Sequence, residues 1–343
     1  MHMKRLLFVL IAIVLFSGGI VVSSGYMFYD PEGVVSDTGY IFYVEPEETA
    51  ASLLDKLEEA DVIKYPMAAA VLFELKSYRP SRHPGRYRIL GKESLVDLTN
   101  RLRIGEQTPV RLVFNTMRTV QELCGVVASS LRMDSTELAV LLEDSVYISS
   151  LGFTEKTLPA MFVPNTYNIW WTCRPEEFLS RMKKEYDDFW NASRRAKAGH
   201  LGLTPIEVSV LASIVDEESA RTSEYPMIAG VYLNRLKRGM KLDADPTLKF
   251  AAGDFTLRRV LDVHKMIDSP YNTYRYAGLP PGPIRIPSIQ AIEAVLSPAE
   301  HDYLYFCANS DFSGTHVFAK SIYQHNINAD KYRLALNRRK IFK

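Results

Sequence analysis

Cysteine is scarce in this chain of 343 residues, which contains only Cys124, Cys173 and Cys307. The three are far apart in the sequence and no CxxC motif occurs. Neither a disulfide framework nor a zinc site is therefore expected. A chain of this length can bury a large hydrophobic core without such cross-links, and its length corresponds to about two domains.

An excess of charge of either sign is also missing. Lys and Arg together number 41 against 40 for Asp and Glu, which leaves a formal net charge of +1. Because nucleic-acid-binding proteins normally carry a strong positive field, this balance argues against a nucleic-acid partner. The hydrophobic share of 47% and the charged share of 24% are typical of a folded globular protein, and they exclude a mainly disordered or collagen-like chain.

The N-terminus contains an apolar run at residues 6–22 that has no charged side chain and follows Lys4 and Arg5. With the weakly polar residues 23–25, it approaches the roughly 20 residues that cross a bilayer. Its length favours an uncleaved anchor over a signal peptide, although residues 23–25 would make a tolerable cleavage site. The basic pair predicts a cytoplasmic N-terminus and an exported remainder.

Residues 40–114 alternate between short β-rich runs and segments with helical periodicity. The pattern predicts the order strand, helix, helix, strand, helix, strand, which is a small α+β module. The expected strands are 40–44, 85–89 and 110–114, and the clearest helix is 48–60. Beyond them we expect two short helices within 119–142, a loop at 160–167 and one amphipathic helix at 175–198.

A helix start is clearly marked by Thr204, Pro205 and Glu207, which fit an N-cap, a first helical position and a capping box. We expect this helix to reach about Ser219, and a second one at 225–238 to end at Gly239. Proline and glycine then predict loops at 245–247, 269–274 and 278–284. A helix at 288–296 and strands at 303–307 and 315–319 complete an α+β fold.

One carboxylate of the first of these helices falls on its apolar side. At 100° per residue, Glu218 continues the stripe formed by Leu211, Ile214 and Val215. A carboxyl held against aliphatic side chains is desolvated, so its pKa rises toward the range that a general acid needs. Glu218 is therefore a candidate catalytic acid.

The neighbouring acids, Asp216 and Glu217, point in other directions and are expected on a solvated face. The residues alone also allow a structural role for Glu218. In that interpretation it ends the helix with its carboxylate bonded to the backbone or paired with Arg221, since structural ion pairs also shift carboxyl pKa values.

Several short motifs follow one another in a recognisable order. They begin with Gly85-Arg86-Tyr87-Arg88 and Pro164-Asn165-Thr166-Tyr167, continue through Ala212-Ser213-Ile214-Val215-Asp216-Glu217-Glu218-Ser219, Asn234-Arg235-Leu236, Gly239-Met240, Asp245-Pro246-Thr247, Tyr271-Asn272-Thr273-Tyr274 and Gly278-Leu279-Pro280-Pro281-Gly282-Pro283-Ile284, and end with His316-Val317-Phe318 and His325-Asn326. In sequence, order and approximate spacing, the chain resembles the MltG (YceG-like) endolytic murein transglycosylases over nearly its whole length.

The resemblance implies a fold and an activity. The fold is an N-terminal transmembrane anchor (1–25), a LysM-like membrane-proximal α+β module (26–115) and a C-terminal α+β catalytic domain (116–343). The activity is endolytic cleavage of nascent peptidoglycan strands between N-acetylmuramic acid and N-acetylglucosamine, which leaves 1,6-anhydro ends. No metal and no other cofactor is implied. The expected partners are peptidoglycan glycan strands and cell-wall synthases, and the expected location is the inner membrane with a periplasmic catalytic domain.

The resemblance also assigns residues. The catalytic acid falls on Glu218, and the expected substrate-binding residues are Tyr271, Asn272, Thr273, Asp245, Thr247 and Asn165. An amide and a hydroxyl can bond sugar hydroxyls or N-acetyl groups, and a tyrosine ring can stack on a sugar face. Asn165 stands where the family often has Asp, so no acid or base role is expected there. Without the resemblance, 271–273 is an ordinary turn.

Two other functions remain open. A lysozyme-like muramidase would use Glu218 as the acid and Asp245 or another acid as the second carboxylate. A non-catalytic glycan-binding scaffold of cell-wall synthesis would not require Glu218. His316 and His325 have no third clustered ligand, so we expect them to be polar partners inside the domain rather than metal ligands.

Overall fold

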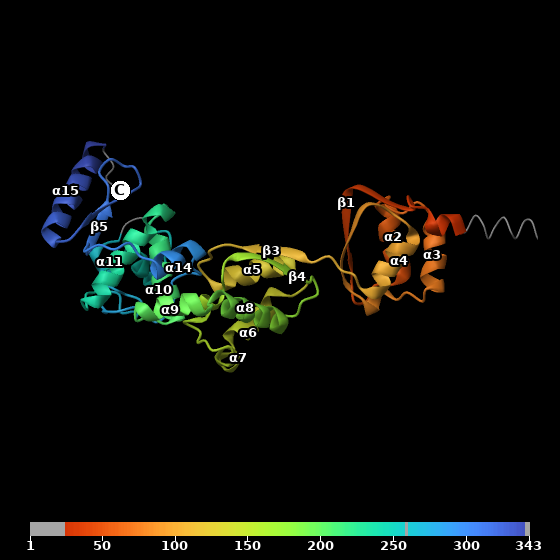
Figure 1. Cartoon of the computed structure of the whole chain (residues 1–343), viewed down its shortest axis with the longest axis horizontal. Coiled ribbons are helices and arrows are strands. Elements are labelled where there is room, and N and C mark those ends of the chain that lie inside the picture. Colours follow the sequence, from red (N-terminus) through yellow and green to blue (C-terminus); the bar gives the residue numbers. More distant parts are fainter. Residues whose placement is uncertain (1–24, 258–259, 340–343) are drawn as a thin grey trace, which may run out of the picture. The chain divides into compact units, whose positions relative to one another are not determined.

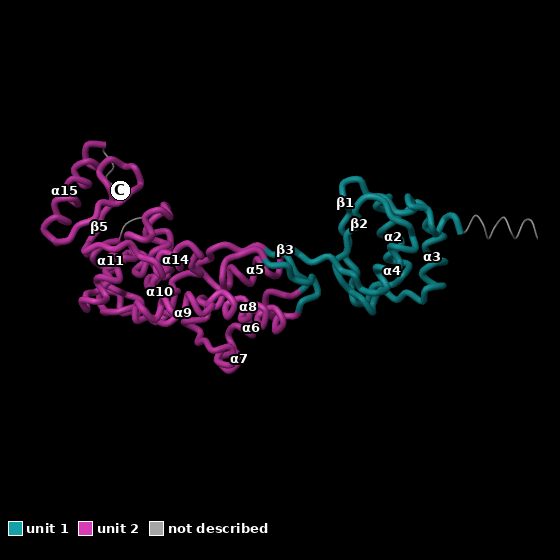
Figure 2. Tube along the Cα trace, viewed as in Figure 1, with its two compact units in different colours: residues 1–112, 130–132, 167–173 teal, residues 113–129, 133–166, 174–343 magenta. Residues whose placement is uncertain are grey.

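A computed structural model describes residues 25–257 and 260–339 (Figure 1). The expected membrane anchor at 6–22 lies outside these residues. The described chain is α+β, as the sequence predicts, and it divides into two compact units (Figure 2). One unit contains the described residues up to 112 together with 130–132 and 167–173, and the other contains the remainder.

The first unit is built around an antiparallel pair of strands, β1 (Val34–Val44) and β2 (Gly85–Glu93). Helices α2 (Ala50–Glu59) and α3 (Pro66–Leu75) and the 3₁₀ helix η1 (Pro80–Arg82) connect the strands, and α4 (Leu95–Ile104) follows β2. The predicted order of elements is confirmed. Strand β1 begins earlier than residue 40, because an irregularity in the register between Ser36 and Tyr40 lets a polar stretch continue it.

The core of the first unit lies between this strand pair and its helices. Phe42 and Tyr87 are register partners and their rings stack at 5.7 Å. Leu53 and Leu57 of α2 are fully buried, as is Ile89 of β2. The period-2 strand pattern and the helical stripe that appear in the sequence therefore meet in one hydrophobic cluster.

A second strand pair is formed by β3 (Val110–Phe114) and β4 (Asn165–Ile169). The prediction of β3 is confirmed at both ends. The expected loop at 160–167 is partly wrong, because the 3₁₀ helix η2 (Leu158–Met161) precedes Pro164 and a strand begins at Asn165. Tyr167 and Ile169 are buried and alternate with exposed neighbours, which is the pattern of a strand with one covered face.

The second unit is mainly helical (Figure 1). Its elements are α5 (Val120–Ser130), α6 (Ser135–Glu143), α7 (Ser145–Ser150), α8 (Pro175–Phe189), α9 (Ala192–His200), α10 (Pro205–Glu218), η3 (Thr222–Glu224), α11 (Tyr225–Lys237), α12 (Asp245–Ala252), α13 (Asp262–Lys265), α14 (Ile289–Leu296), β5 (Tyr305–Ala308), β6 (His316–Ala319) and α15 (Ile322–Arg338). Strands β5 and β6 form an antiparallel hairpin.

Two expectations for this unit are corrected. The helix predicted at 175–198 is two helices, because Asn191 caps a new one by accepting the backbone N–H of Arg194. The loop predicted at 245–247 is the first turn of α12, where Pro246 costs nothing since that N–H has no helical partner. The glycine stop is confirmed, with Gly239 at a φ of 63°.

Helix α10 is the centre of the second unit. The predicted capping box is present, with Thr204 accepting from the N–H of Glu207 and the Glu207 carboxylate accepting from the N–H of Thr204. Every residue from Val208 to Val215 is buried. A helix that is apolar on all sides must be enclosed, and α11, α12 and α14 all pack against α10.

Asp216 links the end of α10 to the beginnings of α11 and α14 by hydrogen bonds. Its carboxylate accepts hydrogen bonds from the hydroxyl of Tyr225 at 2.8 Å, and from the backbone N–H and hydroxyl of Ser288 at 3.0 and 2.9 Å. Tyr225 is the first residue of α11 and Ser288 is the N-cap of α14. The solvated face predicted for Asp216 is wrong, because its side chain is 6% exposed.

Within residues 25–257 and 260–339, no single helix has the length and hydropathy that a membrane crossing requires. Helices α9 and α10 would meet the criterion only as a bent pair, with 76° between them.

We expect Asp216→Asn to lower the free energy of unfolding by about 1 to 3 kcal/mol, because an amide nitrogen would face donors that now bond a carboxylate. Asp187→Asn is the control, since Asp187 pairs with Lys183 on an exposed helix face at 2.5 Å. That pair contributes at most about 1 kcal/mol. Chemical denaturation of both variants measures the difference, and equal losses would contradict the anchoring role of Asp216.

Candidate active site

A cavity of about 440 Å³ lies at the carboxyl end of α10. Its polar lining comes from elements that are far apart in the sequence: Glu218 of α10, Tyr232 and Arg235 of α11, Asp243, Asp245 at the start of α12, Tyr274, Tyr305 and Cys307 of β5, His316 of β6 and His325 of α15. The cavity therefore forms only where the loop at 269–276 and the C-terminal hairpin meet the end of α10.

Glu218 is the last residue of α10, and its carboxyl is the most perturbed acid in this cavity. Tyr232 donates its hydroxyl hydrogen to Glu218 Oε1. Burial raises the pKa of Glu218 from 4.5 to about 7, the Tyr232 hydrogen bond opposes this rise, and the negative charge of Asp245 adds to it. At neutral pH both protonation states are populated, which is what general acid and base catalysis requires.

The carboxyl end of a helix is an unfavourable place for negative charge, because the helix dipole is negative there. Three acids in succession occupy this end, and each meets a different environment. Asp216 is held by hydrogen bonds, and Glu217 forms ion pairs with Arg285 at 2.5 Å and Arg118 at 3.4 Å. Glu218 has no such cation within ion-pair distance in the described chain, so its carboxyl responds by retaining a proton more strongly.

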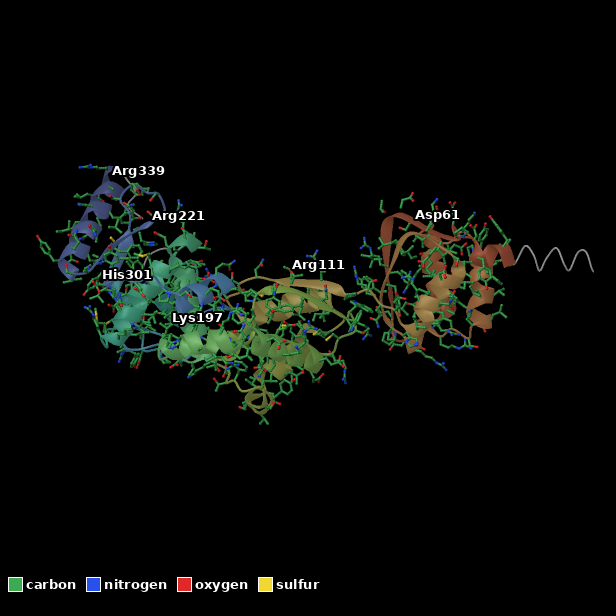
Figure 3. The ribbon with its side chains drawn as sticks, viewed as in Figure 1. Asp61, Arg111, Lys197, Arg221, His301 and Arg339 are labelled. Carbon is green, nitrogen blue, oxygen red and sulfur yellow. The ribbon has the colours of Figure 1, made fainter. Side chains whose placement is uncertain are left out.

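The alternative structural role of Glu218 is not what the structure shows. Arg221, marked in Figure 3, donates to the carbonyl oxygen of Ser313 rather than to Glu218. The prediction that Glu217 lies on a solvated face is also wrong, since its side chain is 17% exposed and carries two ion pairs.

Asp245 is the second carboxylate of the cavity. It is exposed, lies in the first turn of α12, and accepts a hydrogen bond from the hydroxyl of Tyr274 at 2.5 Å. The amino end of a helix favours negative charge. The cavity thus contains one desolvated acid at a helix carboxyl end and one exposed acid at a helix amino end.

The 271–274 motif contributes Tyr274 to this cavity, and the expected substrate residue Tyr271 lies elsewhere. Tyr271 packs against Phe250 with ring centroids 4.6 Å apart, and it lines a different cavity of about 520 Å³ together with Arg118 and Pro283. Sequence reasoning thus missed Tyr274, although it belongs to the same motif.

Asn272, Thr273 and Thr247 are buried, with exposures of 0, 2 and 0%. The Asn272 amide donates to the carbonyl oxygens of Lys265 and Ile267, and its oxygen accepts from the N–H of Tyr274. The expectation of a solvent-facing amide is therefore wrong. These buried side chains hydrogen-bond to backbone groups or to each other, and none of them lines the Glu218 cavity.

The two threonines join the loop to α12. The hydroxyls of Thr247 and Thr273 lie 2.8 Å apart, and Thr273 also accepts from the N–H of Ala244. This link fixes Tyr274 beside Asp245. Asn165, the remaining expected substrate residue, is exposed in β4 and accepts from its neighbour's N–H. It does not line the Glu218 cavity.

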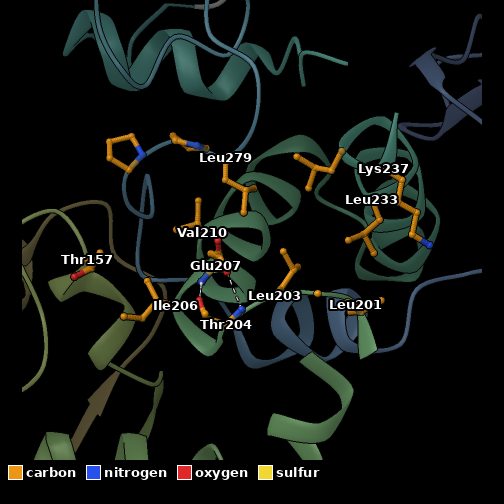
Figure 4. A pocket seen from close by; sticks show the side chains of 14 residues that line it. Thr157, Leu201, Leu203, Thr204, Ile206, Glu207, Val210, Leu233, Lys237 and Leu279 are labelled. Carbon is orange, nitrogen blue, oxygen red and sulfur yellow. Dashed lines mark hydrogen bonds between the residues drawn. The ribbon is translucent and has the colours of Figure 1, made fainter. Parts of the chain in front are cut away.

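A larger cavity of about 690 Å³ lies at the other end of α10 (Figure 4). Its lining is mainly aliphatic, and the carboxylate of Glu207 and the hydroxyl of Thr204 are occupied in the capping box, as the dashed lines in Figure 4 show. Glu207, the acid in this lining, thus already has a structural role in the capping box. The described chain also has no group of three or more His, Cys, Asp or Glu placed to hold a metal ion.

The fold and the site define an α+β protein whose cavity is centred on one desolvated glutamate. The chain belongs to the YceG-like family, whose model matches residues 42–331. The resemblance seen in the motifs is thereby confirmed.

Curated relatives carry the name endolytic murein transglycosylase. The Bacillus subtilis (strain 168) protein is 45% identical over 122 residues, which are 36% of this chain and 33% of the relative. The Streptococcus pneumoniae serotype 2 protein is 28% identical over a region covering 74% of this chain and 51% of the relative. The chain spans about half the length of these relatives or less.

One solved structure shows a related fold. The crystal structure of a YceG-like protein from Listeria monocytogenes aligns with a TM-score of 0.58 at 23% identity, and it covers 84% of this chain and 98% of the other. This likeness concerns the fold alone.

Two substitutions should move the pKa of Glu218 in opposite directions. Asp245→Asn removes a negative charge and should lower the pKa below about 7, whereas Tyr232→Phe removes a hydrogen bond to the carboxylate and should raise it. The side-chain carboxyl ¹³C shift of Glu218, followed by NMR across pH, measures both. Glu176→Gln, an exposed change on α8, should leave the titration unaltered. Shifts of the same sign would contradict the electrostatics described for this cavity.

Proposed function

We propose that the chain is a membrane-anchored, endolytic peptidoglycan lytic transglycosylase. It cleaves the bond between N-acetylmuramic acid and N-acetylglucosamine in nascent strands and leaves 1,6-anhydro-N-acetylmuramic acid ends. The observation that carries the proposal is the Glu218 carboxyl, whose pKa is raised to about 7 at an accessible cavity. Membership of the YceG-like family and the names of the relatives support it.

In this reaction Glu218 acts twice. Its protonated form donates a proton to the glycosidic oxygen, which leaves with the departing sugar. The resulting carboxylate then takes the proton of the muramoyl 6-hydroxyl while that oxygen attacks C1, so the enzyme returns to its starting state. A pKa near 7 serves both steps, and the hydroxyl of Tyr232 holds the carboxyl in place.

A lysozyme-like muramidase is the second candidate, and the position of Asp245 in the same cavity favours it. A glycoside hydrolase normally needs a second carboxylate, either to activate water or to form a covalent intermediate. A transglycosylase of the proposed kind does not, because its nucleophile belongs to the substrate. The two reactions differ in their products, since hydrolysis leaves a reducing end that contains one more water.

Glu218→Gln should reduce strand cleavage by at least about 100-fold, because it keeps the shape of the side chain and removes the transferable proton. Purified sacculi digested with the parent protein and analysed by mass spectrometry should give anhydro ends. Glu176→Gln should cleave normally. Products heavier by one water would establish the muramidase, and cleavage by neither Glu218→Gln nor the parent would leave only a binding scaffold.

The Glu218→Gln variant should remain folded, and its thermal stability relative to the parent should depend on pH. The folded state holds the Glu218 pKa above 4.5, so the stability contributed by the protonated carboxyl is present below about pH 4.5 and lost as pH rises through about 7. Glutamine cannot ionise. Glu218→Gln should therefore melt above the parent at about pH 8, and this advantage should disappear toward pH 4.5.

The proposal extends to location and to the first unit. We propose that residues 6–22 anchor the chain in the inner membrane with a periplasmic catalytic domain, on the strength of the apolar run and the basic pair before it. Residues 26–115 would be a LysM-like module, and the order β1, α2, α3, β2 supports this. Cell-wall synthases that make nascent strands are the proposed partners.

Protease added to spheroplasts should degrade the full-length chain, because all residues after about 25 lie outside the membrane in this topology. A cytoplasmic marker protein should survive the same treatment. Immunoblotting of membrane and soluble fractions should show no membrane-free mature form. A soluble product beginning near residue 25 would replace the anchor with a cleaved signal peptide.

A further inference from the structure

Glu224 and His316 form a partly buried pair at the Glu218 cavity, which His316 lines. The Glu224 carboxylate accepts the backbone N–H of His316 at 2.7 Å and bonds the ring Nδ1 at 2.9 Å, and it also accepts the hydroxyl of Ser219 at 2.9 Å. The two side chains are 12 and 15% exposed. Burial alone would raise the pKa of Glu224, but these hydrogen bonds outweigh it and hold the pKa below 4.5.

This geometry fixes which ring nitrogen carries the hydrogen. A carboxylate only accepts hydrogen bonds, so Nδ1 of His316 must be the donor. In the neutral ring Nε2 is then an acceptor, an orientation that second partners commonly impose on functional histidines. Nε2 has no hydrogen-bond partner within residues 25–257 and 260–339, while His316 lines the Glu218 cavity.

Two routes connect His316 to the candidate catalytic acid. On one side Glu224 bonds Ser219, the residue directly after Glu218. On the other, the His316 ring meets Phe306 edge to face at 5.3 Å, and Phe306 meets Tyr232 at 5.8 Å, whose hydroxyl bonds Glu218. The imidazole and the carboxyl are thus held in one wall of the cavity.

We propose that His316 contacts the glycan directly, with Nε2 accepting a hydrogen bond from a sugar hydroxyl or an acetamido N–H bound against Glu218, and that Glu224 is the positioning residue. The inference rests on the proposed function for the identity of the ligand. A glycan strand presents such donors on every sugar, and an imidazole ring that donates from Nδ1 offers Nε2 as an acceptor when the ring is neutral.

The ring is not needed to anchor the hairpin. The backbone N–H of His316 already bonds Glu224, and β6 pairs with β5 along the whole strand. A side chain that keeps the Nδ1 bond and lacks Nε2 therefore separates contact with the glycan from structural support. Asparagine meets this requirement, because its amide nitrogen occupies the position of Nδ1.

The test uses the full-length protein carrying Glu218→Gln, which binds strands without cutting them. The probe is peptide-free glycan strands released from sacculi by an amidase, and calorimetry measures Kd. Adding His316→Asn should raise Kd by about threefold to tenfold, the value of one neutral hydrogen bond. His200→Asn, at the exposed end of α9, should not change it. An unchanged Kd in the His316→Asn protein would overturn the proposal.

A second measurement does not depend on the folding of that variant. Long-range ¹H–¹⁵N NMR spectra of the Glu218→Gln protein should show His316 with its hydrogen on Nδ1, and added glycan should shift its Nε2 resonance but not that of His200. The opposite tautomer, or no shift on saturation, would overturn the contact. If the strands do not bind the Glu218→Gln protein at all, the proposed function fails as well. If they bind and the His316 Nε2 resonance does not shift, only this inference fails.

Discussion

Helix α10 is enclosed on every side from Val208 to Val215, and the rest of the second unit is arranged around that enclosure. Because this helix has no solvated face, the carboxylates of the three acids at its end are taken out of water. Each carboxylate must therefore be paired or hydrogen-bonded, or its charged form is disfavoured. Asp216 accepts hydrogen bonds from residues at the starts of two other helices, and Glu217 forms ion pairs with two arginines. Glu218 lies at a cavity and accepts the hydroxyl hydrogen of Tyr232, and burial raises its pKa to about 7.

Polar residues near the cavity divide into two groups by burial. Asn272, Thr273 and Thr247 are enclosed and bond to backbone or to each other, and their task is to place the loop and the start of α12. Asp245 and Glu218 remain within reach of a ligand. Unpaired buried polar groups are costly, so a precise loop of this kind requires a nearly complete internal network.

Local signals in the sequence predicted the α+β class, the order of the first unit and the limits of α10, because caps, prolines and periodicity act within a few residues. The candidate acid was also predictable, since a helical wheel gives direction. The hydrogen-bond partners of the polar side chains could not be predicted. Nothing near Asp216 in the sequence indicates Ser288, and nothing near Asn272 indicates that two backbone carbonyl oxygens accept hydrogen bonds from its amide. Helix α15 was not predicted because it has no buried residue and hence no apolar stripe.

The cavity joins Glu218 to His316 and His325, which come from the last part of the chain. A polypeptide is synthesised from its N-terminus, so α10 is made long before β6 and α15, which line the cavity. Contacts of such large sequence separation are also the slow ones to form. The Glu218 cavity is consequently among the last parts of the molecule to be completed, and a chain truncated before β6 would carry Glu218 without the His316 and His325 side chains that line its cavity.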